Sequence, residues 1–230
     1  MNKEKSYLNK ERIEKYLSYL NSNLIRNVIL FSGGIILFII GCIAYGVILN
    51  LRDVPLSQDI TEKGFTKLND PNIIINRQSY TLNLYEDTVL IKSYRANFGR
   101  NVIVPKTKAG DLATPVGDYQ ICEIDTVDKY YKFFRINYPN ENDAAEALKK
   151  GLITQGEYDR IKFEDTYGQC PDANTALGGN IGIQGIGRLN FIFRYLPFNY
   201  NWTNGSIAIS NESIDELYSV VKKGTKVVIK

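Results

Sequence analysis

A run of 22 uncharged and mostly apolar residues, Val28 to Leu49, restricts what this chain can fold into more than any other feature. The run lies between Arg26 and Arg52, and its length matches the ~20 residues with which an α-helix crosses a ~30 Å hydrocarbon core. It is too long for the apolar region of a signal peptide, and no clear cleavage site of small residues follows it. The sequence therefore predicts an uncleaved transmembrane helix over residues 28–51.

Basic residues are concentrated on one side of this run. Residues 1–51 contain six Lys/Arg and three Asp/Glu, and five of the basic residues lie between positions 3 and 15. Because Lys and Arg in short flanking segments favour the cytoplasmic side, we predict a single-pass protein with a cytoplasmic N-terminus and an extracytoplasmic C-terminal part. In the cytoplasmic tail, residues 1–27, apolar residues recur at helical spacing from Ser6 to Leu20. This spacing predicts an amphipathic helix that is solvated, adsorbed to lipid, or bound to a partner.

The rest of the chain has no charge excess and the whole chain has no histidine. Residues 52–230 contain 22 basic and 22 acidic residues, which argues against nucleic acid as a partner because such binding depends on phosphate neutralisation. The absence of histidine removes the commonest general base, the commonest metal ligand, and any Cys-His or Ser-His dyad. We predict no metal site and no cofactor.

A β-rich domain with short helices is predicted to follow a spacer over residues 52–71. Apolar residues alternate with polar ones from residue 72 onward, and the acidic turn Glu86-Asp87 joins two such runs as a hairpin. Capping residues and helical spacing predict three helices in the domain, 72–230. The expected strands are 73–76, 81–85, 89–98, 118–124, 133–138 and 226–230, and the expected helices are 140–150, one that begins at Thr154, and 211–222.

The stretch from Gly178 to Ser213 has the strongest signal for a site. It contains two short apolar runs that end in glycine or are interrupted by it, one around Ile183 and one around Ile207. Glycine permits positive φ and close approach of backbone or ligand. Two such turns in a β-rich domain predict a cleft.

This stretch resembles the core of the L,D-transpeptidase catalytic domain, also called the YkuD domain. Members of that family carry His-Gly on one strand and, further along the chain, Thr/Ser-x-Gly-Cys-Ile. Here the corresponding residues are Gln184-Gly185 and Thr203-Asn204-Gly205-Ser206-Ile207. The resemblance therefore puts Gln184 at the catalytic histidine position and Ser206 at the position of the nucleophilic cysteine.

The resemblance covers the chain from about Ile73 to Lys230. It includes the Thr-Pro-x-Gly element at residues 114–117, and the Tyr138-Pro139-Asn140 entry to a helical insert resembles the subgroup of Gram-negative bacteria. It implies an extracytoplasmic domain on a bacterial inner membrane. It also implies peptidoglycan stem peptides as the substrate class, with roles in cell-wall biogenesis and cell shape.

The two replacements predict that the family chemistry is lost. A serine hydroxyl must be deprotonated by a neighbouring base as it attacks, and a glutamine amide cannot be that base. We therefore expect Gln184 and Ser206 to be vestigial, in a cleft that binds cell wall or cell-wall proteins without cutting. Backbone N–H groups near Ser206 would remain as a former oxyanion hole. The residues expected to contact the ligand are Gly185, Arg188, Trp202, Asn204 and Gly205.

Other interpretations stay open. Ser206 could act as a nucleophile in an active acyltransferase or hydrolase if an unrecognised carboxylate such as Asp172 served as its base. Alternatively, Gln184 and Ser206 hydrogen-bond to each other in a closed site, and the domain is a protein-interaction module that does not use the old cleft.

Three cysteines are present. Cys42 lies inside the predicted membrane helix, and Cys122 and Cys170 lie in the domain. Outside the cytoplasm the latter two can form a disulfide, but the sequence does not give the Cα separation that such a bond requires. Free thiols, or a displaced nucleophile at Cys170, are the alternatives.

Overall fold

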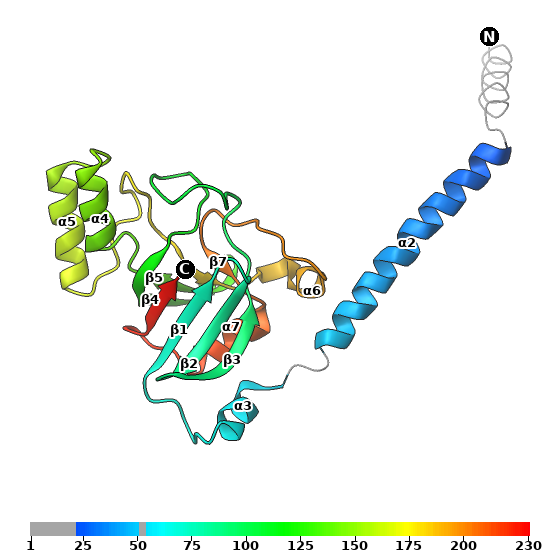
Figure 1. Ribbon diagram of the computed structural model, residues 1–230, viewed down its shortest axis with the longest axis horizontal. Helices are drawn as coiled ribbons and strands as arrows, with labels where there is room; N and C mark the ends of the chain where they lie inside the picture. The colour runs from blue at the N-terminus through cyan, green and yellow to red at the C-terminus, as the bar shows by residue number, and fades with distance from the viewer. Residues whose placement is uncertain (1–21, 51–53) are drawn as a thin grey trace, which may run out of the picture.

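The computed structural model describes residues 22–50 and 54–230, and the helix predicted for Ser6 to Leu20 lies outside them. Helix α2 (Ser22–Asn50) projects away from a β-rich domain (Figure 1). Within the described ranges it is the one helix that is long and apolar enough to cross a membrane, over Asn23–Ile48. Its side chains are largely exposed, as expected of a helix whose surroundings are lipid.

Eight strands form one sheet in the order β3-β2-β1-β8-β4-β5-β6-β7. Neighbouring strands are antiparallel except for two parallel pairs, β1 with β8 and β6 with β7. The last strand of the chain therefore lies near the centre of the sheet and joins the N-terminal hairpin to the half that carries the cleft. The strands are β1 (Pro71–Asn76), β2 (Thr81–Glu86), β3 (Val89–Arg95), β4 (Gly117–Asp128), β5 (Tyr131–Ile136), β6 (Gly182–Gln184), β7 (Ile207–Ala208) and β8 (Lys226–Ile229).

Short helices surround the sheet, so the predicted fold class is confirmed. Thr154 caps α5, as its sequence pattern predicts, and Asn140 caps α4 through a capping box with Asp143. Helix α7 ends at Tyr218, earlier than predicted, and Lys222 lies beyond it. The helices of the domain are α3 (Leu56–Glu62), α4 (Glu141–Lys149), α5 (Gln155–Thr166), the 3-10 turn η1 (Gly187–Leu189), α6 (Asn190–Phe193) and α7 (Asn211–Tyr218).

The predicted spacer, residues 52–71, contains a helix that packs on the domain. Leu56 and Ile60 of α3 are buried in the core. The backbone N–H of Leu56 donates to Glu216 Oε1 at 2.9 Å, and Lys92 Nζ donates to the carbonyl oxygen of Val54. The packed part of the chain thus begins close to residue 54, which leaves a very short connection to α2.

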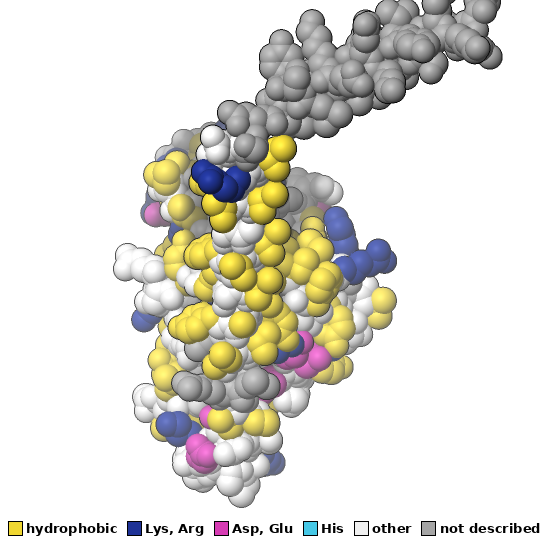
Figure 2. All heavy atoms as spheres, turned by 90° about the vertical axis from the view of Figure 1, so that its right-hand side faces the viewer, with side chains coloured by type: hydrophobic (Ala, Val, Ile, Leu, Met, Phe, Trp, Pro, Cys, Tyr) yellow, Lys and Arg dark blue, Asp and Glu magenta, His cyan; other side chains and the backbone are white. Residues whose placement is uncertain are grey.

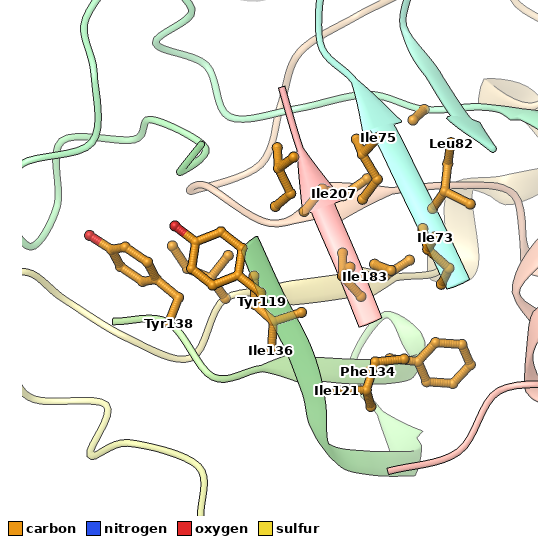
Figure 3. Packing of buried hydrophobic residues seen from close by; sticks show 14 of the residues in the cluster. Ile73, Ile75, Leu82, Tyr119, Ile121, Phe134, Ile136, Tyr138, Ile183 and Ile207 are labelled. Atoms are coloured by element: carbon orange, nitrogen blue, oxygen red, sulfur yellow. The ribbon is translucent and has the colours of Figure 1, made fainter. Parts of the chain in front are cut away.

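The core lies on the face of the sheet where alternate residues are buried. Along β1 the pattern is strictly alternating, with Ile73 and Ile75 fully buried. Figure 3 shows these two side chains beside Ile183 of β6 and Ile207 of β7. Apolar packing therefore fixes β6 and β7, the two short strands that carry the predicted site.

A disulfide joins Cys122 of β4 to Cys170, with a Cα–Cα distance of 5.3 Å. It ties the loop that follows α5 to the sheet. The alternatives of free thiols and of a displaced nucleophile at Cys170 are therefore wrong.

Candidate ligand-binding cleft

Two parallel strands bring the predicted site residues together. Ile183 of β6 pairs with Ile207 of β7, and Gln184 pairs with Ala208. Ala208 exchanges both backbone hydrogen bonds with Asn97 at 2.8 Å, which holds β7 from its other side. Because side chains alternate along a strand, Gln184 and Ser206 point to the face of the sheet opposite to that of the buried Ile183 and Ile207. Gln184 and Ser206 are in this way brought to one small pocket.

This pocket, which we call the polar pocket, has a volume of about 200 Å³. In the described part of the chain, Gln184 and Ser206 make no hydrogen bond to each other, so the interpretation of a pair that closes the site is not supported. Gln184 is nevertheless only 5 % exposed. The residues that line the pocket are Tyr130, Phe133, Asn180, Gln184, Trp202, Thr203, Asn204 and Ser206.

The two glycines predicted to contact a ligand, Gly185 and Gly205, also have structural roles. A Cβ at Gly185 would lie 2.7 Å from the carbonyl oxygen of Tyr130, so this glycine allows close packing of two backbones. Gly205 has φ +126°, a conformation that side chains rarely adopt, and its N–H donates to Thr203 Oγ1 at 3.2 Å. The neighbouring N–H of Ser206, by contrast, has no acceptor among the described residues.

Asn204 and Arg188 lie in different surroundings. Asn204 lines the polar pocket, and its Oδ1 accepts a hydrogen bond of 2.7 Å from Arg100. Arg188 is exposed and lies on a second, larger pocket of about 830 Å³, which we call the apolar pocket. That pocket is lined by Lys129, Tyr130, Tyr131, Ile186, Gly187, Arg188, Leu189, Phe193, Trp202 and Asn211.

Trp202 and Tyr130 line both pockets and therefore form the wall between them. Their rings meet edge to face with centroids 5.4 Å apart. The indole N–H of Trp202 is buried and has no acceptor in the described structure. A ligand with an oxygen at this point would gain a hydrogen bond that the protein leaves unmade.

Three residues that line the polar pocket were not predicted from the sequence: Tyr130, Phe133 and Asn180. Phe133 reaches the polar pocket because β5 pairs antiparallel with β6, which sets Phe133 opposite Gln184. Tyr130 belongs to the turn between β4 and β5. Only Asn180 carried a local signal, because it lies within the glycine-rich stretch and has φ +54°. The aromatic residues Phe198 and Tyr200 are absent from the linings of both pockets and are 59 % and 52 % exposed.

No carboxylate, lysine or arginine lines the polar pocket as the structure describes it. Asp172 is not part of it: its Oδ2 accepts from Arg160 at 3.1 Å, and its Oδ1 accepts from the N–H of Asn174. The described residues also contain no cluster of three or more Cys, Asp or Glu side chains that could hold a metal ion. The chemistry that this pocket offers is hydrogen bonding and aromatic contact.

The groups with strongly shifted pKa values lie elsewhere. Burial raises the pKa of Asp143 to about 6, although hydrogen bonds from the Asn140 N–H and the Tyr119 hydroxyl favour its ionised form. Burial also raises the pKa of Tyr119, and that of Tyr138, whose ring lies beside it (Figure 3). This cluster supports the start of α4 and is part of the scaffold.

Comparison with known families agrees with this geometry. The family model of the L,D-transpeptidase catalytic domain matches residues 70–229, which include both strands of the polar pocket. The chain belongs to the L,D-transpeptidase catalytic domain family. This confirms the resemblance inferred from the residues around Gln184 and Ser206, and the fold that the resemblance implies. No curated protein sequence matches the chain.

Solved structures with the same fold are distant in sequence. The helical cell shape determining protein Pgp2 from Campylobacter jejuni is 20 % identical with a TM-score of 0.45, and the match covers 76 % of this chain and 55 % of that one. An L,D-transpeptidase from Xylanimonas cellulosilytica is 13 % identical with a TM-score of 0.41, over 77 % and 70 % of the two chains. An L,D-transpeptidase from Mycobacterium smegmatis is 10 % identical with a TM-score of 0.40, over 70 % and 58 %. The chain thus spans little more than half the length of the Campylobacter protein.

Proposed function

We propose that this protein is a membrane-anchored L,D-transpeptidase-like domain that binds peptidoglycan stem peptides outside the cytoplasmic membrane and does not cut them. One observation carries the proposal: the polar pocket contains Gln184 and Ser206, and among the described residues no ionisable side chain other than Tyr130 lines it. The pocket has the aromatic walls and amide groups that hold a peptide. It lacks a base that could deprotonate Ser206.

The loss of chemistry follows from the two side chains together. A cysteine near its reference pKa of about 8.5 is partly thiolate at neutral pH, whereas a serine needs a partner to take its proton. Gln184 offers two N–H donors and one oxygen acceptor but takes up no proton. The same groups are well suited to hydrogen-bond the amides and carboxylates of a stem peptide.

Placement outside the cytoplasm is supported by two independent features. Helix α2 has the length and composition of a membrane span, with the basic excess of the chain on its N-terminal side. The disulfide of Cys122 and Cys170 is of a kind that persists in oxidising compartments. We propose an uncleaved anchor, and the mass of the mature protein in isolated membranes distinguishes this from a removed signal sequence.

This placement puts the domain in the cell envelope, where binding to the wall would contribute to cell-wall biogenesis and cell shape. Peptidoglycan stem peptides are the proposed ligand, and cell-wall proteins are the alternative partner. A role as an interaction module that ignores the cleft would leave the aromatic walls of the polar pocket unexplained.

The test incubates the full chain, in detergent micelles, with purified sacculi and measures co-sedimentation, muropeptide masses and protein mass. We expect co-sedimentation with an unchanged muropeptide profile. New cross-links, released D-Ala, or an acyl adduct on Ser206 would instead make the protein a serine-dependent member of the family. Absence of co-sedimentation would favour the interaction module.

A double variant tests whether the cleft still positions substrate. Gln184→His with Ser206→Cys restores the residues that the family uses, and we expect it to regain measurable transpeptidase or carboxypeptidase activity. The matched control is Gln155→His with Ser57→Cys, which places the same two side chains at exposed positions on α5 and α3. If the cleft variant has no more activity than this control, the cleft no longer positions stem peptides for the reaction.

A further inference from the structure

The connection between β6 and β7 exposes apolar side chains at an unusual density. Five large hydrophobic residues between positions 189 and 200 are 47–67 % exposed. Isolated exposed hydrophobic residues are ordinary, but a contiguous set marks an interaction surface. We call this set the apolar ridge: Leu189, Phe191, Ile192, Phe198 and Tyr200.

Several polar groups of this connection are hydrogen-bonded to the domain, although the large apolar side chains are exposed. Arg95 on β3 donates to the carbonyl oxygens of Phe193, Arg194 and Leu196. Asn190 Nδ2 donates to both carboxylate oxygens of Glu212, at 3.0 and 2.9 Å. The ridge is therefore presented outward on a backbone that is held firmly.

The chain between α2 and the domain is too short to let the domain leave the membrane. Helix α2 ends at Asn50, and the backbone is already bonded to the domain at Val54 and Leu56. Four residues span at most about 14 Å when fully extended. If α2 crosses the bilayer, the domain must lie against the surface of that bilayer.

The ridge lies on the side of the domain that meets α2. The backbone of Tyr195 packs on Gly46, where a Cβ would come within 2.1 Å of the Tyr195 carbonyl oxygen. Gly46 is in the last turn of the membrane span, which extends to Ile48. Figure 1 shows α6 beside this end of the helix, and Figure 2 shows hydrophobic side chains gathered on the face of the molecule that carries α2.

The composition of this region fits the boundary between lipid and water. Aromatic rings are favoured at that depth, and Phe191, Phe198 and Tyr200 supply them. Arg188 and Lys129, both exposed, lie at the edge of the same region and suit anionic phosphate groups.

We propose that the apolar ridge is a membrane-docking surface, which inserts into the outer headgroup region of the same bilayer that α2 crosses. Leu189 belongs both to the ridge and to the lining of the apolar pocket, so docking turns that pocket toward the membrane. This proposal rests on the proposed anchor, but it does not depend on which ligand the cleft binds.

The single tryptophan of the chain, Trp202, is a native reporter for the test. The full chain is reconstituted into vesicles of phosphatidylethanolamine and phosphatidylglycerol in which part of the acyl chains carries bromine, a contact quencher of tryptophan fluorescence. We expect quenching of Trp202 in the unmodified protein. We expect the quenching to fall by about half or more in Phe191→Ser/Phe198→Ser, because these rings supply much of the inserted apolar area.

Phe163→Ser is the matched control. Phe163 lies on α5, far from α2 in Figure 1, and at 57 % it is about as exposed as Phe198. It should keep the quenching of the unmodified protein. Near-ultraviolet circular dichroism establishes that each variant is folded.

Two results would overturn the proposal: no quenching in a protein that floats with the vesicles, or equal quenching in the ridge variant and the unmodified protein. A ridge buried between two copies would give the first result together with cross-linked dimers. A protein that does not float at all refutes the anchor itself, and co-sedimentation with sacculi then still tests the proposed function separately.

Discussion

The two connections that flank β6 are both helical insertions between neighbouring strands, yet they are built on opposite principles. The first, residues 137–181, contains α4 and α5, whose N-caps are Asn140 and Thr154. The second, residues 185–206, contains η1 and α6, which begin without a side-chain cap. Local sequence organises the first connection, whereas contacts from distant strands organise the second.

The same contrast appears in which side chains face water. The first connection buries Ala144, Ala147 and Ile161 in the core. The second bonds several backbone carbonyls and Asn190 to the domain, and it exposes the five residues of the apolar ridge within twelve positions. A segment without side-chain caps and with exposed apolar residues is suited to contact a surface outside the domain. We interpret the apolar ridge as such a contact surface.

Removal of the disulfide should give the largest effect and should weaken the first connection. The bond of Cys122 to Cys170 closes a loop over a sequence separation of 48 residues. In the chain-entropy account such a bond contributes about 4 kcal/mol by restricting the unfolded chain. We expect Cys122→Ala/Cys170→Ala to lose about 2–4 kcal/mol in the free energy of unfolding, measured by urea denaturation. Cys42→Ala is the control, and an equal loss in it would contradict this prediction.

A group in the first connection, Asp143 of α4, should also make the free energy of unfolding depend on pH. Burial raises the pKa of Asp143 to about 6, so the folded protein keeps a proton that the unfolded chain releases near pH 4. A raised carboxyl pKa favours folding at low pH, and that contribution is lost as the pH rises through 6. In the unmodified protein, Asp143 should lower the free energy of unfolding by about 2–3 kcal/mol between pH 4 and pH 7, and Asp143→Asn should abolish this decrease.

Thermal unfolding of the two proteins across that pH range measures the effect. Asp159→Asn, at an exposed position of α5, is the control and should follow the unmodified protein. If Asp143→Asn keeps the slope of the unmodified protein, Asp143 is not the group that titrates.

Replacement of Arg95 should have the smallest effect on global stability, and its effect should be confined to the second connection. Its guanidinium donates to three carbonyl groups of the second connection. We expect Arg95→Ala to cost about 1 kcal/mol globally but to speed amide exchange across residues 189–198. Hydrogen exchange read by mass spectrometry measures this change.

Arg77→Ala is a suitable control, because Arg77 is a half-buried arginine whose side chain donates once, to the carbonyl of Val102. The second connection should exchange at its normal rate in that variant. If Arg95→Ala leaves the exchange of residues 189–198 unchanged, the ridge is held by contacts other than this arginine.

Much of the fold could be predicted because its signals are local. Alternation of apolar residues marked β1 and β2, the Asn140 and Thr154 patterns marked the helix starts, and the glycine-rich stretch marked the site. Helix α3 was not predicted, because only two of its seven residues, Leu56 and Ile60, are apolar and buried. Their burial depends on contacts with the distant strand β3 and helix α7.

The sequence by itself determined the apolar span, the β-rich domain and the identity of the two side chains in the polar pocket, because these depend on composition, periodicity and adjacent residues. The tertiary structure alone decided that Cys122 meets Cys170, that Phe133 stands opposite Gln184, and that Asp172 pairs with Arg160 away from Ser206. It also decided that Phe191, Phe198 and Tyr200 face outward. Such pairings depend on strand register and on contacts between distant segments, which no local pattern encodes.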